Sequence, residues 1–145
     1  GLVEERLEEA GACADVFDKV TINPAYTCYK TVPTRETQVS INVGDIELDK
    51  IIVSISGGEK SKSFEAEKDA TVNNVKDFGE ADTGEGDIGY GKSLKFPGKN
   101  EGLTYVVNTF SFLGTLKPDS IQISPVVNGE QCGVTDSLLE IPICS

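Results

Sequence analysis

The hydrophobic pattern of the chain changes its period near Gly11. From Leu2 to about Ala10, apolar residues recur three to five positions apart and glutamates occupy the opposite side, which is typical of an amphipathic helix. Gly11 ends this pattern. So short a helix is not stable alone, because nucleation costs more than its few hydrogen bonds return. The segment 1–11 is therefore predicted either to cap the domain or to be the end of a longer stalk helix.

After Gly11 the pattern alternates with a period of two, as in half-buried β-strands. The stretches "TQVSINV" (37–43) and "KIIVSIS" (50–56) place apolar residues on one face and mostly polar residues on the other. The segment "GDIELD" between them has turn character. These two strands are therefore predicted to form an antiparallel pair.

Further strands and turns follow along the rest of the chain. Asn128-Gly129 is the strongest short hairpin signal, because both residues tolerate the positive φ of a type I′ turn. The other predicted strands are 16–22, 27–31, 61–67, 71–75, 103–112, 121–127, a return from Glu130, and 138–143. With no internal helix signal, the pattern predicts an all-β fold, an immunoglobulin-like antiparallel β-sandwich, as a single domain over 12–145.

The aromatic run "TYVVNTFSF" (104–112) allows two interpretations. An aromatic surface that binds sugars is one. The alternation of aromatic and β-branched residues favours the other, a strand in the sandwich core.

One long irregular segment, at about 77–102, is rich in glycine and acidic residues. Asp82, Glu85 and Asp87 stand close enough together to be weak candidates for a Ca²⁺ site. They do not match the EF-hand loop, which needs oxygen ligands where Gly84 and Gly86 stand. A solvated acidic loop is the favoured interpretation, so we predict no metal and no cofactor. Carboxylates in so exposed a segment also make a poor glycosidase pair.

Composition excludes several classes of function. The 145 residues include 24 Asp and Glu against 13 Lys and Arg, a net charge of −11, which repels nucleic acid and anionic membrane surfaces. Histidine is absent. The chain therefore has no Ser-His or Cys-His nucleophile pair and no imidazole-bound catalytic zinc, and we predict that it is not an enzyme.

Four cysteines, Cys13, Cys28, Cys132 and Cys144, stand near the two ends of the chain. Their scattered spacing disfavours a four-thiolate zinc site, and buried free thiols are the main alternative to disulfides. Two disulfides fit best and indicate a compartment outside the reducing cytosol. Four cysteines allow three pairings. We slightly prefer the local one, Cys13 with Cys28 and Cys132 with Cys144.

Methionine is also absent, so Gly1 is expected to be a processing point or the edge of a cut chain rather than a translation start. This favours the interpretation that Leu2, Val3 and Leu7 belong to the end of a stalk whose hydrophobic part was removed. Burial of the same three side chains against the sandwich would instead make the helix a cap.

Four segments together resemble the soluble part of archaeal type IV pilin-like proteins, the class that includes archaellins. They are "LVEERLEEAG", "TCYK", "VSINVGDIELDKIIVSISG" and "IQISPVVNGEQCGVTDSLLEIPIC". In the third segment, Asn42, Gly44, Leu48 and Gly57 occupy the places of a recurrent motif between two strands of that family. The resemblance covers most of the domain in order, at the level of pattern.

The resemblance implies a structural function. Members of that family carry a hydrophobic N-terminal helix that anchors the subunit in the membrane and then packs in the centre of a filament, with a β-sandwich head outside. This chain lacks such a helix, so it is predicted to be the head of an extracellular cell-surface filament subunit. Its partners would be other copies of itself and, in adhesion, a surface or cell receptor, with membrane contact only through the missing helix. The alternative is a secreted or cell-surface β-sandwich module that binds glycan or protein.

Overall fold

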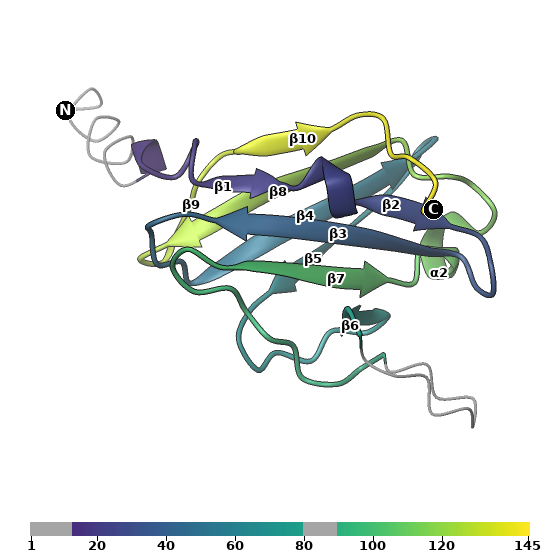
Figure 1. Cartoon of the computed structure of the whole chain (residues 1–145), viewed down its shortest axis with the longest axis horizontal. Helices are drawn as coiled ribbons and strands as arrows, with labels where there is room; N and C mark the ends of the chain where they lie inside the picture. The colour runs from purple at the N-terminus through teal and green to yellow at the C-terminus, as the bar shows by residue number, and fades with distance from the viewer. Residues whose placement is uncertain (1–12, 80–89) are drawn as a thin grey trace.

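The computed structural model describes residues 13–79 and 90–145, which form two largely antiparallel β-sheets packed face to face (Figure 1). The predicted all-β sandwich is confirmed at this level. The predicted helix at 1–11, with Leu2, Val3 and Leu7, lies outside the described residues. So do the weak Ca²⁺ candidates Asp82, Glu85 and Asp87.

Within these two ranges, each sheet contains five strands. The front sheet of Figure 1 has the order β1-β3-β7-β6, with β2 also paired to β3. Its strands are β1 (Val20–Ile22), β2 (Cys28–Lys30), β3 (Glu36–Val43), β6 (Val75–Asp77) and β7 (Gly102–Val107). The back sheet has the order β10-β8-β4-β5, with β9 also paired to β8. Its strands are β4 (Lys50–Gly57), β5 (Lys60–Ala66), β8 (Ser120–Val127), β9 (Glu130–Gln131) and β10 (Asp136–Leu138).

The core consists of the alternating apolar residues of both sheets. Val39, Ile41 and Val43 on β3 face Ile51, Val53 and Ile55 on β4, and all six are buried. Phe64 and Tyr105 meet edge to face across the layers, with their ring centroids 6.4 Å apart. The period of two in the sequence thus marks the buried face of these strands, as predicted.

The predicted pairing of 37–43 with 50–56 is wrong. β3 pairs with β1, β2 and β7, and β4 pairs with β5 and β8, so the two strands lie in opposite sheets. The connection between them crosses the sandwich, and its residues Ile46 and Leu48 pack against the core. Crossing buries the apolar faces of both strands against each other, whereas a hairpin would place them side by side in one sheet.

The predicted strand 103–112 ends early. β7 stops at Val107 and is followed by the short helix α2 (Phe110–Leu113), so the expectation of no internal helix is wrong. The buried Thr37 hydroxyl donates to the Thr109 hydroxyl oxygen at 3.1 Å, which holds the chain where it leaves the sheet. Gly114, with φ of 60°, ends the turn by donating its N–H to the Phe110 carbonyl. Phe110 is exposed, so the part of this run that forms a core strand ends at Val107.

The edge strand beside β3 is split into β1 and β2. The 3-10 turn η1 (Pro24–Tyr26) separates them, and the Asn23 side chain accepts the Ala25 N–H at its start. The buried Thr27 hydroxyl accepts the Ser40 N–H and donates to the Asn23 carbonyl. A side chain therefore replaces the ladder bonds that the interruption removes.

The edge strand beside β8 is split in the same way. The predicted hairpin at Asn128-Gly129 is confirmed, with φ of 52° and 80°, and it leads into β9. β10 then continues along β8. The two split edges lie on the same side of the sandwich, where β1 and β10 run next to each other (Figure 1).

Candidate functional site

All four cysteines are oxidised, in two disulfides that span almost the whole chain. Cys13 is bonded to Cys132 and Cys28 to Cys144, with sequence separations of 119 and 116. The expected local pairing is therefore wrong. The fold brings the first edge strands of the front sheet against the last edge strands of the back sheet, so each disulfide joins the beginning of the domain to its end.

The Cys13–Cys132 disulfide is buried where the described part of the domain begins. The Cys13 carbonyl accepts the Val16 N–H in the helical turn that precedes β1, which is why the predicted strand 16–22 starts only at Val20. Cys132 follows β9 and donates its N–H to the Pro125 carbonyl at 2.8 Å. The bond therefore ties the start of the front sheet to the interior strand β8 of the back sheet.

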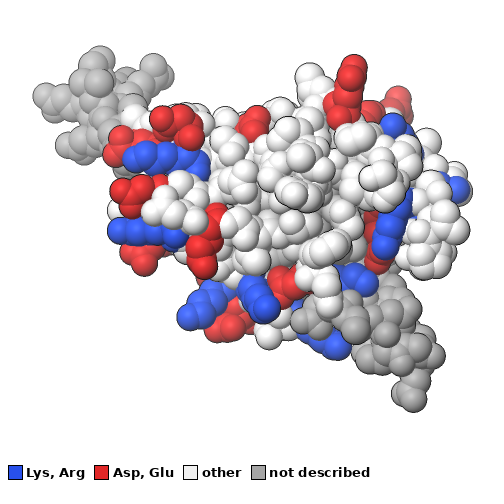
Figure 2. All heavy atoms as spheres, in the orientation of Figure 1, with Lys and Arg blue, Asp and Glu red and all other residues white. Residues whose placement is uncertain are grey.

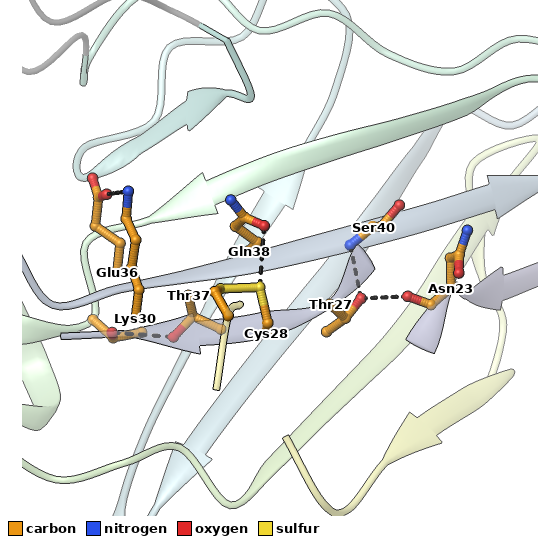
Figure 3. The surroundings of a disulfide bond; sticks show 10 residues. Asn23, Thr27, Cys28, Lys30, Glu36, Thr37, Gln38 and Ser40 are labelled. Carbon is orange, nitrogen blue, oxygen red and sulfur yellow. Dashed lines mark hydrogen bonds and ion pairs between the residues drawn. A yellow bond between two sulfur atoms is a disulfide. The ribbon is translucent and has the colours of Figure 1, made fainter. Parts of the chain in front are cut away.

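The Cys28–Cys144 disulfide joins β2 to the C-terminal segment (Figure 3). The Tyr29 N–H donates to the Pro142 carbonyl and the Cys144 N–H to the Tyr29 carbonyl, both at 2.8 Å. Residues 141–145 thus leave the back sheet and add parallel pairing to the front sheet. Gln38 Oε1 lies 3.1 Å from Cys28 Sγ, but a disulfide sulfur has no hydrogen to donate, so this is a packing contact.

Hydrogen bonds also join the two edges directly. The Ile22 N–H donates to an Asp136 carboxylate oxygen at 2.8 Å, and the Thr135 hydroxyl donates to the Val20 carbonyl at 2.8 Å. We call this side of the sandwich, made of β1, β2, β9, β10 and residues 139–145, the closed side. Side chains of the back sheet and the C-terminal segment thus bond backbone groups of β1 and β2 that an edge strand otherwise leaves unpaired.

The opposite side is built differently and is called the open side. It carries the edge strands β5 and β6, and all four cysteines lie elsewhere. A cleft of about 440 Å³ lies between β5, the segment 70–75 and α2, and Phe64, Val72 and Phe112 are among its lining residues. The open side is therefore held by packing rather than by covalent bonds.

A buried carboxylate links β6 to the rest of the front sheet. Glu36 is 3% exposed and lies between Lys30 on β2, at 2.9 Å, and Lys76 on β6, at 3.5 Å. The Tyr90 hydroxyl donates to the same carboxylate, and the Lys76 ammonium lies 4.8 Å from the Tyr90 ring centroid. Figure 3 shows the Lys30 part of this cluster, next to the disulfide.

The electrostatics of this cluster favour a structural role. Burial by itself raises the pKa of Glu36, but the hydrogen bonds from Tyr90 and Lys30 and the charges of Lys76 and Lys30 outweigh it, so the pKa is lowered. Burial and the neighbouring Glu36 carboxylate raise the pKa of Tyr90. A carboxylate held ionised is a poor proton acceptor at neutral pH, so the cluster does not fit a general base.

The described residues also limit the other kinds of site. Within 13–79 and 90–145, no three Asp, Glu, Cys or His side chains converge as metal ligands would. In the same two ranges, no helix has the length and apolar character needed to cross a bilayer.

Comparisons of the chain with protein-family models, with curated proteins and with solved structures found no match. Its function must therefore be inferred from its own residues.

Proposed function

We propose that this domain is the head of an extracellular filament subunit of the archaeal type IV pilin-like kind, with a structural function. The observation that carries the proposal is the Cys13–Cys132 disulfide. It sits where the chain enters the described sandwich from its N-terminal side and bonds that point covalently to the back sheet. A stalk attached at residues 1–12 would therefore pull on both sheets at once.

The closed side supports this mechanical role. A load applied at Cys13 reaches β1 through the backbone and β8 through Cys132, whose N–H is bonded to Pro125 on β8. β8 and its neighbour β4 pair over almost their full length. The load is thus shared between the β1–β3 ladder of the front sheet and the β4–β8 ladder of the back sheet instead of peeling one edge strand away, which suits a domain held at one end.

The disulfides also support an extracellular location. Two intact disulfides are maintained in oxidising compartments and are rare in a reducing cytosol. Covalent links between the ends of the chain resist unfolding and proteolysis, which an exposed filament surface requires. The net charge of −11 keeps separate heads soluble.

The strand order supports an immunoglobulin-like description of the sandwich. The strands can be lettered in chain order as in immunoglobulin domains, with β1 and β2 together as A, β5 as C′, and β9 and β10 together as G. The front sheet then has the order A-B-E-D and the back sheet the order G-F-C-C′, which are the arrangements of an immunoglobulin-like sandwich. The disulfides depart from that family's pattern, because they join the edge strands on the closed side instead of the interior strands B and F.

Immunogold electron microscopy tests the filament role. Antibody raised against residues 13–145 is applied to cells of the source organism, with serum absorbed on the same domain as the control. We expect gold along filaments that leave the cell surface. Gold spread over the surface without filaments would instead support the secreted or cell-surface module that binds glycan or protein. Gold confined to the cytoplasm would contradict both.

A further inference from the structure

The outer face of the front sheet carries a hollow with few charges. In Figure 2, charged side chains gather around the rim of this view, and the area over β1, β3 and β7 is white. In this view, the uncharged area over three strands contrasts with the charged rim around it. Such an area is a candidate for binding.

The floor of this hollow is a row of uncharged groups that crosses four strands. Asn23 follows β1 and donates its N–H to Ser40 on β3, Ser40 lies opposite Thr104 on β7, and the Phe78 N–H donates to the Thr104 carbonyl. The Thr104 hydroxyl donates to the Ser40 hydroxyl at 3.0 Å. At the usual distance between strands, the row is about 14 Å long.

A glycine leaves space for a side chain two residues further along these strands. Gly102 lies opposite Asn42, and a Cβ at this position would come within 2.8 Å of the Asn42 side-chain oxygen. The missing side chain lets the Asn42 amide lie over the β7 backbone. The amide therefore remains available at the surface, and Asn42 is exposed.

Two aromatic rings border the hollow. Tyr26 on η1 is 65% exposed and Phe78 after β6 is 60% exposed, and both line a depression of about 360 Å³ together with Asn23, Ser40, Asn42 and Thr104. Asp77 and Lys95 also line it, and the Asp77 carboxylate accepts the Lys95 backbone N–H at 3.1 and 3.2 Å. The hollow therefore presents two exposed aromatic rings together with amides and hydroxyls.

We propose that this hollow binds a neutral carbohydrate chain. Sugar rings present an apolar C–H face that packs on Tyr26 and Phe78, and hydroxyls that the Asn23 and Asn42 amides can bond. The scarcity of charge favours a neutral ligand over an anionic one, and the length of the row favours an oligosaccharide over a single sugar. The site would give the head an adhesive face, and its chemistry is independent of filament assembly.

Affinity electrophoresis tests the site with defined probes. The chain is run in native gels that contain soluble β-glucan, mannan, xylan or galactan, with polygalacturonate as the anionic probe and an empty gel as the reference. We expect at least one neutral polysaccharide to retard the chain. Tyr26→Ala and Phe78→Ala should each weaken that retardation about tenfold in apparent affinity, because each removes one stacking surface.

Phe110→Ala is the matched control. Phe110 on α2 is 58% exposed, so this substitution also removes an exposed aromatic ring, but one outside the hollow. The polysaccharide should retard the Phe110→Ala variant as much as the unchanged chain. Thermal unfolding of all three variants confirms that they fold. The proposal is overturned if no neutral polysaccharide retards the chain, if only polygalacturonate does, or if Phe110→Ala weakens binding as much as the other two variants.

Discussion

The closed and open sides of the sandwich border one apolar core but hold their edges by different means. On the closed side, β1 and β10 are joined by side-chain hydrogen bonds and flanked by both disulfides. On the open side, within the part of the chain that the structure describes, β5 pairs with β4 alone and β6 with β7 alone, with a cleft between them. The difference shows that the covalent reinforcement is concentrated where the chain enters and leaves the described domain.

The two disulfides act as a nested pair. Either one alone would close a loop of more than a hundred residues in the unfolded chain. Once one exists, the other closes only about 27 residues, 15 from Cys13 to Cys28 and 12 from Cys132 to Cys144. The loop-entropy relation then gives about 4.9 kcal/mol for the first bond and about 3.6 kcal/mol for the second.

Loss of both disulfides should have the largest effect. Replacing all four cysteines with serine should lower the free energy of unfolding by about 8 kcal/mol, which is comparable to the whole stability of a typical domain. We expect the variant to be largely unfolded at 25 °C by circular dichroism. The unchanged chain with and without reductant in urea titrations is the control. A cooperative transition at unchanged urea concentration would show that the closed side does not depend on its covalent links.

Loss of one disulfide should lower the global stability and, in addition, loosen the closed side locally. We expect the Cys28→Ser, Cys144→Ser double variant to lose about 3.6 kcal/mol. The amide protons of Tyr29 and of the residue at position 144 should exchange faster in it, because residues 141–145 are freed from β2. Native-state hydrogen exchange measures this. The amides that join β4 to β5 should still exchange only through global unfolding, because the open side keeps its contacts. Faster exchange of those amides through local opening would show that the two sides do not differ.

The Cys13→Ser, Cys132→Ser double variant is the matched comparison. Because the two disulfides close loops of similar length, this variant should lose a similar free energy of unfolding. The two bonds differ in accessibility, however, since Cys13 and Cys132 are buried and Cys28 and Cys144 are partly exposed. Mild reductant should therefore open Cys28–Cys144 first, which mass spectrometry of alkylated peptides can follow. Reduction of Cys13–Cys132 first would contradict this order.

Glu36 tests the polar link between the two sides. We expect Glu36→Gln to lower the free energy of unfolding at pH 7 by about 3 kcal/mol, because Lys30 and the mostly buried Lys76 lose their common carboxylate. Glu65→Gln is the control. Glu65 pairs with Lys50 at 3.0 Å but is 55% exposed, so its loss should cost less than about 1 kcal/mol. Similar losses in the two variants would show that burial of the Glu36 cluster does not matter.

The stabilisation by Glu36 should also depend on pH. The folded pKa of Glu36 is below its ordinary value of 4.5, so the unfolded chain takes up the proton first as the pH falls. The stabilisation is therefore present above pH 4.5 and is lost as the pH drops through the lower, folded pKa. Urea titrations at pH 7 and pH 3 should show the gap between the unchanged chain and Glu36→Gln narrowing. A constant gap would contradict the lowered pKa.

Local pattern predicted the parts of the fold that local chemistry determines. The alternation of Val39, Ile41 and Val43 marked the buried face of β3, and Asn128-Gly129 marked the hairpin from β8 to β9, because side-chain direction and backbone φ are properties of neighbouring residues. The cysteine pairing and the β3–β4 relation depend on which strands become neighbours in space. That choice is made by the packing of the whole core, so the preference for near partners failed.

The clusters on the front sheet were missed for a related reason. Glu36 occupies an outward position of an alternating strand, where a charged residue is normally solvated, and nothing near it in the sequence indicates Tyr90 or Lys76. Tyr26 and Phe78 are likewise isolated aromatics in the sequence. Tyr26 and Phe78 reach the same hollow only through the strand pairing that aligns Asn23, Ser40, Thr104 and Phe78.

The smallest effect on stability is expected at the unpaired edge of the open side. Lys62 on β5 lies opposite the buried Ile55, on the face that carries Phe64 and Ala66, so a charge interrupts an otherwise apolar stripe along this edge. Charges in such positions prevent edge-to-edge pairing. Lys62→Val should change the free energy of unfolding by less than about 0.5 kcal/mol, yet sedimentation velocity should show association that increases with concentration. Lys62→Gln, which stays polar, should remain monomeric. If both variants associate, the cause is the loss of the Lys62 positive charge and not the gain of an apolar side chain. If neither associates, the open side is protected from edge pairing by something other than Lys62.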